Sequence, residues 1–207
     1  MTLVDVIERY RIVPVLVLNK SEWAEKIGHL LVELELPLVE LTLRTSSAFE
    51  SLEELVKIDG LKVGVGSVQT GDQMERAKQI GASFAVSAGI NELLLSKALE
   101  LGLDYLPGVS TPSEILTAIE FGQQTVKWFP ASALGGPATL KAISAPFPNV
   151  RFVPTGGIAR SNLQDYLALD SVLGVGGSWM FAKTEMEELF FVKLREALTE
   201  IKNESFI

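Results

Sequence analysis

Short runs of β-branched and other apolar residues alternate along the chain with longer amphipathic segments. Runs of this length and composition predict buried strands, and the intervening segments have the spacing of helices with one apolar face. A regular alternation of this kind predicts parallel strands joined by helical crossovers. The predicted strands are Ile12–Leu18, Leu38–Leu43, Lys62–Gly66, Phe84–Ser87, Asp104–Leu106, Thr125–Trp128, Arg151–Pro154 and Val172–Gly176.

Signals for helices lie between these runs. Ser21–Leu34 opens with a serine and carries an apolar stripe at helical spacing, and Glu185–Ile201 has a similar pattern near the end of the chain. Thr111 is followed by Pro112 at the first helical position and by Glu114 at the third. This combination predicts a capped helix start.

Eight strand–helix units are the number that closes a (β/α)8, or TIM, barrel. The alternative is an open, doubly wound sheet, which in its dinucleotide-binding form carries G-x-G-x-x-G after the first strand. Gly64-Val65-Gly66 supplies only the first half of that motif, and it ends the third strand. No Pro-rich, Ser-rich or charged linker divides the chain. The sequence therefore predicts an α/β fold with a single barrel domain, residues 1–207.

Composition narrows the classes of partner. Of the 207 residues, 47% are hydrophobic, which excludes a disordered chain. No apolar run approaches the roughly 20 residues of a membrane span, and the N-terminus lacks the pattern of a signal peptide. The net charge of −8 disfavours nucleic acid and anionic membranes. An anionic substrate would need a local attractive site. The absence of cysteine fits a cytoplasmic protein.

Polar residues in the second predicted strand occupy one face. Because side chains alternate along a strand, Glu40, Thr42 and Arg44 share the face that points into the barrel. Burying a glutamate and an arginine there is costly unless they are paired or used. They predict either a structural ion pair or a general acid/base beside a cation that binds a carboxylate.

The sixth predicted strand carries a lysine among apolar residues. Lys127 and Phe129 share a face by the same alternation. A lysine that is desolvated or near another cation, for which Arg44 is a candidate, can lose its proton and attack a carbonyl. The alternative is a lysine whose charged end reaches water at the strand edge.

Two glycine-rich turns follow the last two predicted strands. Gly156 and Gly157 follow the seventh, and Gly176, Gly177 and Ser178 follow the eighth. Barrels often bind phosphate at this position through backbone N–H groups, and glycine lets the backbone approach the phosphate closely. The pair of turns therefore predicts a phosphate site, with ordinary tight turns as the alternative.

The sequence gives little evidence of a metal site. With a single histidine, His29, and no cysteine, a zinc site is not expected. No clustered acidic motif indicates magnesium, although a carboxylate-held ion stays an open alternative.

These segments together resemble a family of aldolases that cleave 2-keto-3-deoxy-6-phosphogluconate (KDPG) and, in many members, 4-hydroxy-2-oxoglutarate (KHG). Each segment alone is weak evidence, but they follow the family's order over nearly the whole chain. The matching segments are Val39–Thr45, Gly64–Val68, Pro107–Thr111, Lys127–Ala131, Pro146–Ile158 and Gly176–Trp179.

The resemblance implies a role for each candidate residue. Lys127 matches the lysine that forms a Schiff base, and Glu40 matches the acid/base carboxylate. Arg44, Ser67 and Phe129 match the site of the keto-acid carboxylate and pyruvate. The phosphate site would comprise Gly156, Gly157, Gly176, Gly177 and Ser178. The resemblance also implies a homotrimer and a reaction without metal or cofactor.

Several residues depart from the family pattern. Ala88 stands in place of a usual proline, and Ser67 in place of a usual threonine. Trp128 replaces a common phenylalanine, and Ser132 stands where many members carry a glutamate. These departures affect the expected substrate more than the expected chemistry. The alternatives are the same reaction on the galactonate epimer of KDPG, a phosphate-binding isomerase, or a catalytically silent barrel that binds sugar phosphates.

Overall fold

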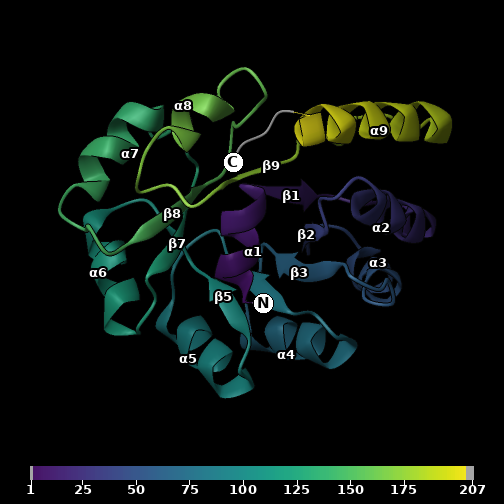
Figure 1. Cartoon of the computed structure of the whole chain (residues 1–207). Helices are drawn as coiled ribbons and strands as arrows, with labels where there is room; N and C mark the ends of the chain where they lie inside the picture. The colour runs from purple at the N-terminus through teal and green to yellow at the C-terminus, as the bar shows by residue number, and fades with distance from the viewer. Residues whose placement is uncertain (1, 204–207) are drawn as a thin grey trace.

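The computed structural model describes residues 2–203. Its strands surround a central axis and its helices surround the strands (Figure 1). The strands are β1 (Ile12–Leu16), β2 (Leu38–Thr42), β3 (Lys62–Gly66), β4 (Phe84–Val86), β5 (Asp104–Leu106), β6 (Gly108–Val109), β7 (Thr125–Trp128), β8 (Arg151–Pro154) and β9 (Val175–Gly177).

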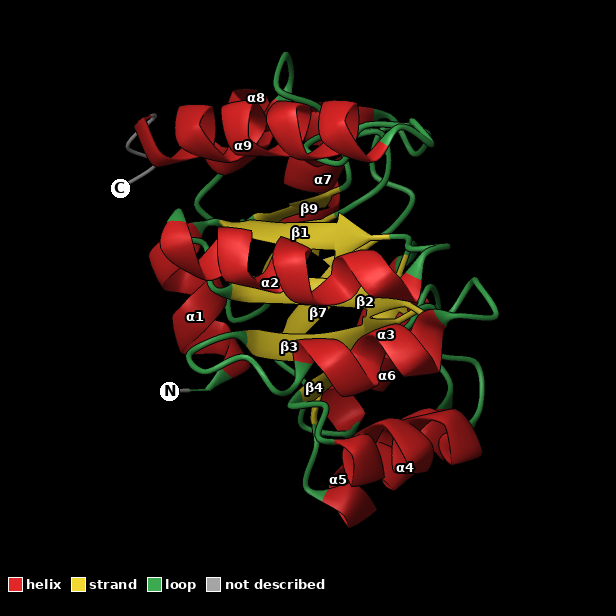
Figure 2. Ribbon diagram, turned by 90° about the vertical axis from the view of Figure 1, so that its right-hand side faces the viewer, coloured by secondary structure: helices red, strands yellow, loops and turns green. Residues whose placement is uncertain are grey.

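Helices follow most of the strands and form the outer layer; α2 and α3 cover the strands in Figure 2. A short 3-10 helix, η1 (Ser21–Trp23), leads into α2. The helices are α1 (Leu3–Tyr10), α2 (Ala24–Glu33), α3 (Ala48–Leu55), α4 (Gly71–Ile80), α5 (Glu92–Leu101), α6 (Pro112–Glu120), α7 (Gly136–Ser144), α8 (Leu163–Leu167) and α9 (Glu187–Asn203).

Every paired strand in the described chain is parallel to its neighbour. Six strands run in the order β5-β4-β3-β2-β1-β9, and three in the order β6-β7-β8. Bridges from Phe152 to Val172 and from Thr155 to Gly176 join β8 to the last strand segment. Only Pro107 separates β5 from β6, so these two form one interrupted barrel strand. The predicted (β/α)8 barrel is confirmed.

Alternation along the strands separates an inner core from an outer core. On β2, Leu38 belongs to the inner cluster, whereas Val39 and Leu41 pack outward against the helices. The inner cluster reaches the end of the barrel where the strands begin, through Leu38 and residues of α1. Glu40 lies two residues after Leu38 on the same face, nearer the C-terminal end of the strand.

The helix α1 closes this end of the barrel. Leu3, Val6 and Ile7 are buried and pack against the inner cluster. Thr2 caps the helix through a reciprocal pair of hydrogen bonds with Asp5. The sequence analysis assigned no helix here, because eight residues give only two apolar turns. Figure 1 shows α1 across the centre of the barrel.

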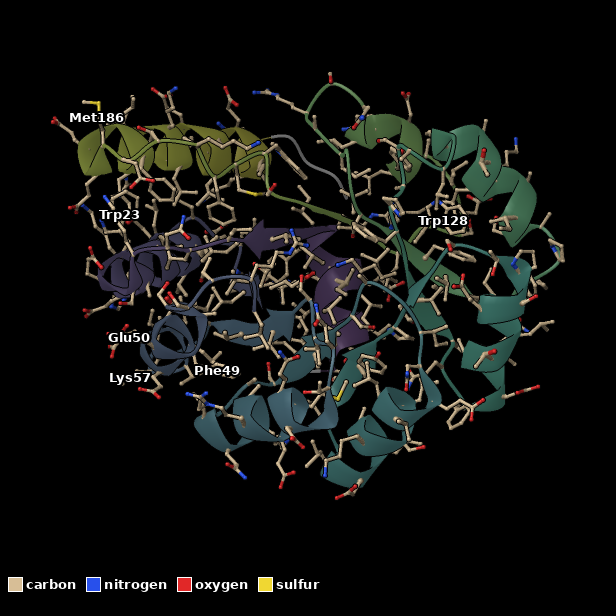
Figure 3. All side chains as sticks on the ribbon, turned by 180° about the vertical axis from the view of Figure 1, so that it is seen from behind. Trp23, Phe49, Glu50, Lys57, Trp128 and Met186 are labelled. Atoms are coloured by element: carbon tan, nitrogen blue, oxygen red, sulfur yellow. The ribbon has the colours of Figure 1, made fainter. Side chains whose placement is uncertain are left out.

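The C-terminal helix α9 packs over the start of the α2 segment. The ring centroid of Trp23 lies 4.9 Å from that of Phe190 and 5.8 Å from that of Phe191. Trp23 lies between α9 and α2 in Figure 3. The helix predicted at Ser21–Leu34 is thus correct in place, with its first turn in the tighter 3-10 form. No helix within residues 2–203 is both long enough and apolar enough to cross a membrane.

Candidate active site

A lysine and a glutamate meet inside the barrel. Lys127 on β7 and Glu40 on β2 are 3% and 1% exposed, and Lys127 Nζ donates a hydrogen bond to Glu40 Oε1 at 3.2 Å. Val126 and Trp128, the neighbours of Lys127, pack into the outer core; Trp128 is labelled in Figure 3. Lys127 therefore points into the barrel beside Glu40, and the alternative of a charged end that reaches water at the strand edge is wrong.

Gly66 provides the space for the carboxylate. A Cβ atom built on Gly66, at the end of β3, would overlap Glu40 Oε1. Since β2 and β3 are in register with Thr42 opposite Gly66, a side chain there would displace the glutamate. Gly66, which the sequence analysis mentioned only as part of an incomplete dinucleotide-binding motif, therefore has a specific function in packing.

Burial makes the pair energetically expensive. Removing two charges from water costs several kcal/mol for each ion, and the attraction between them offsets this only with good geometry. Apolar residues of similar volume are often as stabilising. Stability alone is therefore a weak explanation for this pair. Its hydrogen-bond distance also satisfies the geometric requirement for proton transfer between a nucleophile and a base.

Arg44 lies elsewhere than the alternation predicted. The strand β2 ends at Thr42, so the expected inner face does not extend to Arg44, which is exposed. Its Nε donates a 2.7 Å hydrogen bond to Ser67 Oγ. The charged partner of Lys127 is Glu40. That Arg44 is also a cationic neighbour of the lysine stays a prediction.

Ser67 adopts a backbone conformation that is uncommon for a residue with a side chain. Its φ of 58° lies in the left-handed region. This conformation follows directly after β3 and presents the hydroxyl to the Arg44 guanidinium. The two residues predicted to bind a carboxylate are therefore in contact with each other at the C-terminal ends of neighbouring strands.

A cavity of about 660 Å³ opens next to Arg44. Ser178, Lys20 and Lys183 also line it, together with Glu185, which pairs with Lys20 at 3.3 Å. Lys127 and Glu40 do not line this cavity. It lies between the loop after β1 and the loop after β9.

The two glycine turns come together as predicted. The Thr155–Gly176 bridge joins the segments, and Gly156 and Gly157 have φ values of 96° and 76°, which L side chains rarely adopt. A Cβ on Gly176 would overlap Thr155 Oγ1, and one on Gly177 would overlap the Trp179 ring. These glycines allow the two turns to pack closely at the C-terminal face.

Phe129 connects the lysine to the first turn. Lys127 Nζ lies 5.4 Å from the centroid of its ring. A Cβ built on Gly156 would lie 3.1 Å from the same ring. The half-buried Phe129 ring is thus close to both the amine and the turn at Gly156.

The sequence analysis missed a group of polar contacts behind that turn. Ser132 and Asn162 both donate hydrogen bonds to the Gly157 carbonyl, and the Tyr166 hydroxyl contacts that of Ser132. Ser132 was noted only as a departure from the family, and Asn162 and Tyr166 belong to the α8 segment. No short-range pattern relates the three, because they meet only when α8 packs beside the loop after β7.

A second hydroxyl pair was also missed. Tyr105 and Ser87 are buried, with 2.6 Å between their oxygens. Burial raises the pKa of Tyr105 to about 12, although the hydrogen bond with Ser87 opposes the increase. Residues 2–203 contain no group of three or more His, Cys, Asp or Glu side chains arranged to hold a metal ion.

Comparison with known families assigns the chain. The model of the family described as "KDPG and KHG aldolase" matches residues 3–194. The chain belongs to this aldolase family. The predicted enzyme class, a carbon–carbon lyase of the aldolase type, is thereby confirmed.

Three relatives of this aldolase illustrate the similarity. The 2-dehydro-3-deoxy-phosphogluconate aldolase of Dickeya dadantii is 42% identical over 177 residues, which cover 85% of this chain and 83% of the relative. The KDPG aldolase of Zymomonas mobilis ZM4, solved with 3-phosphoglycerate, has a TM-score of 0.92 and 32% identity, covering 99% of this chain and 96% of that one.

The third relative is the KDPG aldolase of Legionella pneumophila. It was solved with pyruvate captured as a covalent carbinolamine intermediate. Its TM-score is 0.87 at 34% identity, and the match covers 98% of this chain and 97% of that one. The fold and length of this aldolase thus agree with those of relatives from several organisms.

Proposed function

We propose that this aldolase cleaves KDPG to pyruvate and glyceraldehyde 3-phosphate through a Schiff base on Lys127. The observation that carries the proposal is the buried Lys127–Glu40 pair, with 3.2 Å between Nζ and Oε1 at the C-terminal half of the barrel. This pair supplies a nucleophilic amine and a proton acceptor in one water-poor place. The relatives' names support the substrate.

The first stage forms the covalent intermediate. Lys127 in its uncharged form attacks the C2 carbonyl, and the C–N bond forms as the carbonyl electrons move to oxygen. Glu40, which holds the proton that it took from the Lys127 ammonium, gives that proton to the oxygen. It then takes a second proton from the nitrogen and delivers it to the hydroxyl group, which leaves as water, so that the carbinolamine becomes an iminium and Glu40 is again a carboxylate. The carbinolamine captured in the Legionella relative supports an intermediate of this kind.

The second stage breaks the carbon–carbon bond. Glu40 accepts the proton of the C4 hydroxyl, the C3–C4 bond breaks, and its electron pair moves into the iminium to give an enamine. Glyceraldehyde 3-phosphate leaves. Protonation of the enamine at C3 and hydrolysis of the iminium then release pyruvate and regenerate the amine. The iminium withdraws the electrons that a metal would withdraw in other aldolases, so this route uses no metal or cofactor.

The two ends of the substrate require separate sites. We assign the carboxylate to Arg44 and Ser67, since a guanidinium beside a hydroxyl suits a carboxylate. Phe129 packs against the pyruvyl part. We assign the phosphate to the backbone N–H groups of the turns at Gly156–Gly157 and Gly176–Gly177, together with the Ser178 hydroxyl. The cavity that Arg44 and Ser178 both line supports a doubly anionic ligand.

The experiment measures pyruvate release from three compounds. We expect cleavage of KDPG, weaker cleavage of KHG, which lacks the phosphate, and discrimination against the galactonate epimer of KDPG. Preference for that epimer would keep the chemistry and change the assigned substrate. Thermal stabilisation by sugar phosphates without any pyruvate release would instead favour a silent binding barrel.

We also propose that the enzyme works as a cytoplasmic homotrimer. Exposed leucines on successive outer helices support an assembly that would cover them: Leu93 and Leu99 on α5 are 79% and 62% exposed, and Leu116 on α6 is 53% exposed. Sedimentation should give three times the 22.5 kDa mass of the chain. A monomer mass at micromolar concentration would refute the trimer.

A further inference from the structure

The loop after β7 runs beside the turn that follows β8. Ala131 N donates to Thr155 O at 2.8 Å, and Ser132 N donates to Gly156 O at 3.0 Å. The Ser132 side chain continues the series, since its Oγ donates to Gly157 O at 2.8 Å. Three successive carbonyl groups of the turn are thus held from the same side.

The direction of the carbonyl groups fixes the direction of the N–H groups. In a trans peptide, the C=O of one residue and the N–H of the next point in opposite directions. Holding the carbonyls of Gly156 and Gly157 on the Ser132 side therefore turns the N–H groups of Gly157 and Ile158 away from it. These are N–H groups of the turn to which we assign the phosphate.

The Ser132 hydroxyl is itself oriented. A hydroxyl has one proton, and that of Ser132 is used for Gly157 O. Tyr166 Oη, 3.2 Å from Ser132 Oγ, must therefore be the donor in that contact. Tyr166 is 1% exposed and belongs to α8, so the chain of hydrogen bonds from Tyr166 to Ser132 to Gly157 begins at a rigid point.

Packing adds a second restraint. A Cβ built on Gly157 would lie 2.6 Å from Ser132 Oγ, and the φ of Gly157 is 76°. The turn therefore rests directly on Ser132. Asn162 Nδ2 also donates to Gly157 O, at 2.9 Å, so that this carbonyl keeps one donor if the serine hydroxyl is removed.

We propose that Ser132 is a positioning residue for the phosphate end of the substrate. It acts through the backbone of Gly156 and Gly157, and it thereby sets the preference for phosphorylated over unphosphorylated 2-keto acids. This inference rests on the proposed function, in particular on the assignment of phosphate to that turn.

The test compares Ser132→Ala with wild type on KDPG and KHG. We expect the KM for KDPG to rise roughly three- to tenfold, the scale of one lost hydrogen bond, with kcat unchanged. The kinetic constants for KHG should not change, since it has no phosphate. The inhibition constant of inorganic phosphate against KHG cleavage should rise by the same factor as the KM for KDPG.

Two variants control the experiment. Ser83→Ala removes an equivalent bond, 2.8 Å from Ser83 Oγ to Val63 O, at the opposite end of the barrel, and should leave both KM values unchanged. Tyr166→Phe removes the donor to Ser132 but keeps the bond to Gly157. It should raise the KM for KDPG less than Ser132→Ala does.

The outcomes separate this inference from the proposed function. If wild type cleaves KDPG and Ser132→Ala has the same KM and the same phosphate inhibition, the positioning role is wrong while the aldolase assignment stands. Equal losses on KDPG and KHG would also overturn it, because they would indicate general damage. The phosphate assignment itself fails if wild type cleaves KHG, inorganic phosphate does not inhibit that cleavage, and the KM for KDPG is no lower than the KM for KHG.

Discussion

Glu40 and Lys127 illustrate what the sequence can predict at the scale of single residues. Strict alternation on two regular strands places both side chains inside the barrel, and the structure agrees. Arg44 fails the same test because β2 ends two residues before it. The rule of alternation holds only while the strand continues, and the predicted strand, Leu38–Leu43, already ended before Arg44.

Lys127→Ala should abolish cleavage and also destabilise the fold. Removing the amine leaves the Glu40 carboxylate buried without its partner, which typically costs about 3–5 kcal/mol. Urea unfolding measures that loss. The double variant Lys127→Met, Glu40→Gln removes both charges, so it should recover most of the stability and none of the activity. Equal stability of the single and double variants would contradict the account.

Gly66→Ala should reduce activity by displacing Glu40. The added methyl group overlaps the carboxylate, and overpacking of this kind typically costs about 1–3 kcal/mol. Steady-state kinetics and thermal unfolding test both effects. Gly89→Ala is the matched control, because nothing lies within 4 Å of a Cβ there. A fully active Gly66→Ala enzyme would show that the position of the carboxylate is not critical.

At the scale of elements, the strands were easier to predict than the helix that closes the barrel. The bounds predicted for β3, β5, β7 and β8 agree with the structure, because turn signals enclose short apolar runs. The helix α1 was missed, since its two turns are stabilised by inner-core contacts that only the closed barrel provides. The contact of Ser132 with α8 was not predicted either, because it too forms only when the barrel is closed.

The cap of α6 was predicted from sequence and leads to a prediction about pH. Burial raises the pKa of the Glu114 carboxyl, but hydrogen bonds from Ser110 and Thr111 outweigh it and hold the pKa below its ordinary value of 4.5. A lowered carboxyl pKa stabilises the fold above the ordinary pKa, and this contribution disappears as the pH falls through the folded-state pKa.

Glu114→Gln should therefore lose about 1 kcal/mol of stability at pH 7, the usual scale of a helix cap. Its difference from wild type should shrink as the pH falls below 4.5. Denaturant unfolding across this range measures it. Glu120→Gln, at the C-terminal end of the same helix, should lose nothing, because a negative charge there opposes the helix dipole. A difference independent of pH would argue against a charged cap.

At the scale of the whole molecule, the barrel separates stability from chemistry. The inner apolar cluster and α1 fill the end where the strands begin, and the candidate site residues lie toward the other end. The chain has a net charge of −8, but Lys20, Arg44 and Lys183 line one cavity with a single carboxylate, that of Glu185, which pairs with Lys20. The excess of cations provides local attraction for an anionic substrate. Composition predicted the need for such a site but not its location.

Ile7→Ala tests this separation. Ile7 is 1% exposed in the inner cluster, and truncating a buried isoleucine typically costs about 2–5 kcal/mol. The free energy of unfolding should fall by this amount, while the KM for KDPG of the folded enzyme stays unchanged. A large change in KM with little loss of stability would show that α1 communicates with the site.

The most direct test of the central claim is reductive trapping of pyruvate. Borohydride treatment of the active enzyme with pyruvate should add one reduced pyruvyl group, and peptide mass analysis should locate it on Lys127. Glu40→Gln should form this adduct more slowly. An adduct on a different lysine, or none in enzyme that cleaves its substrate, would contradict the account.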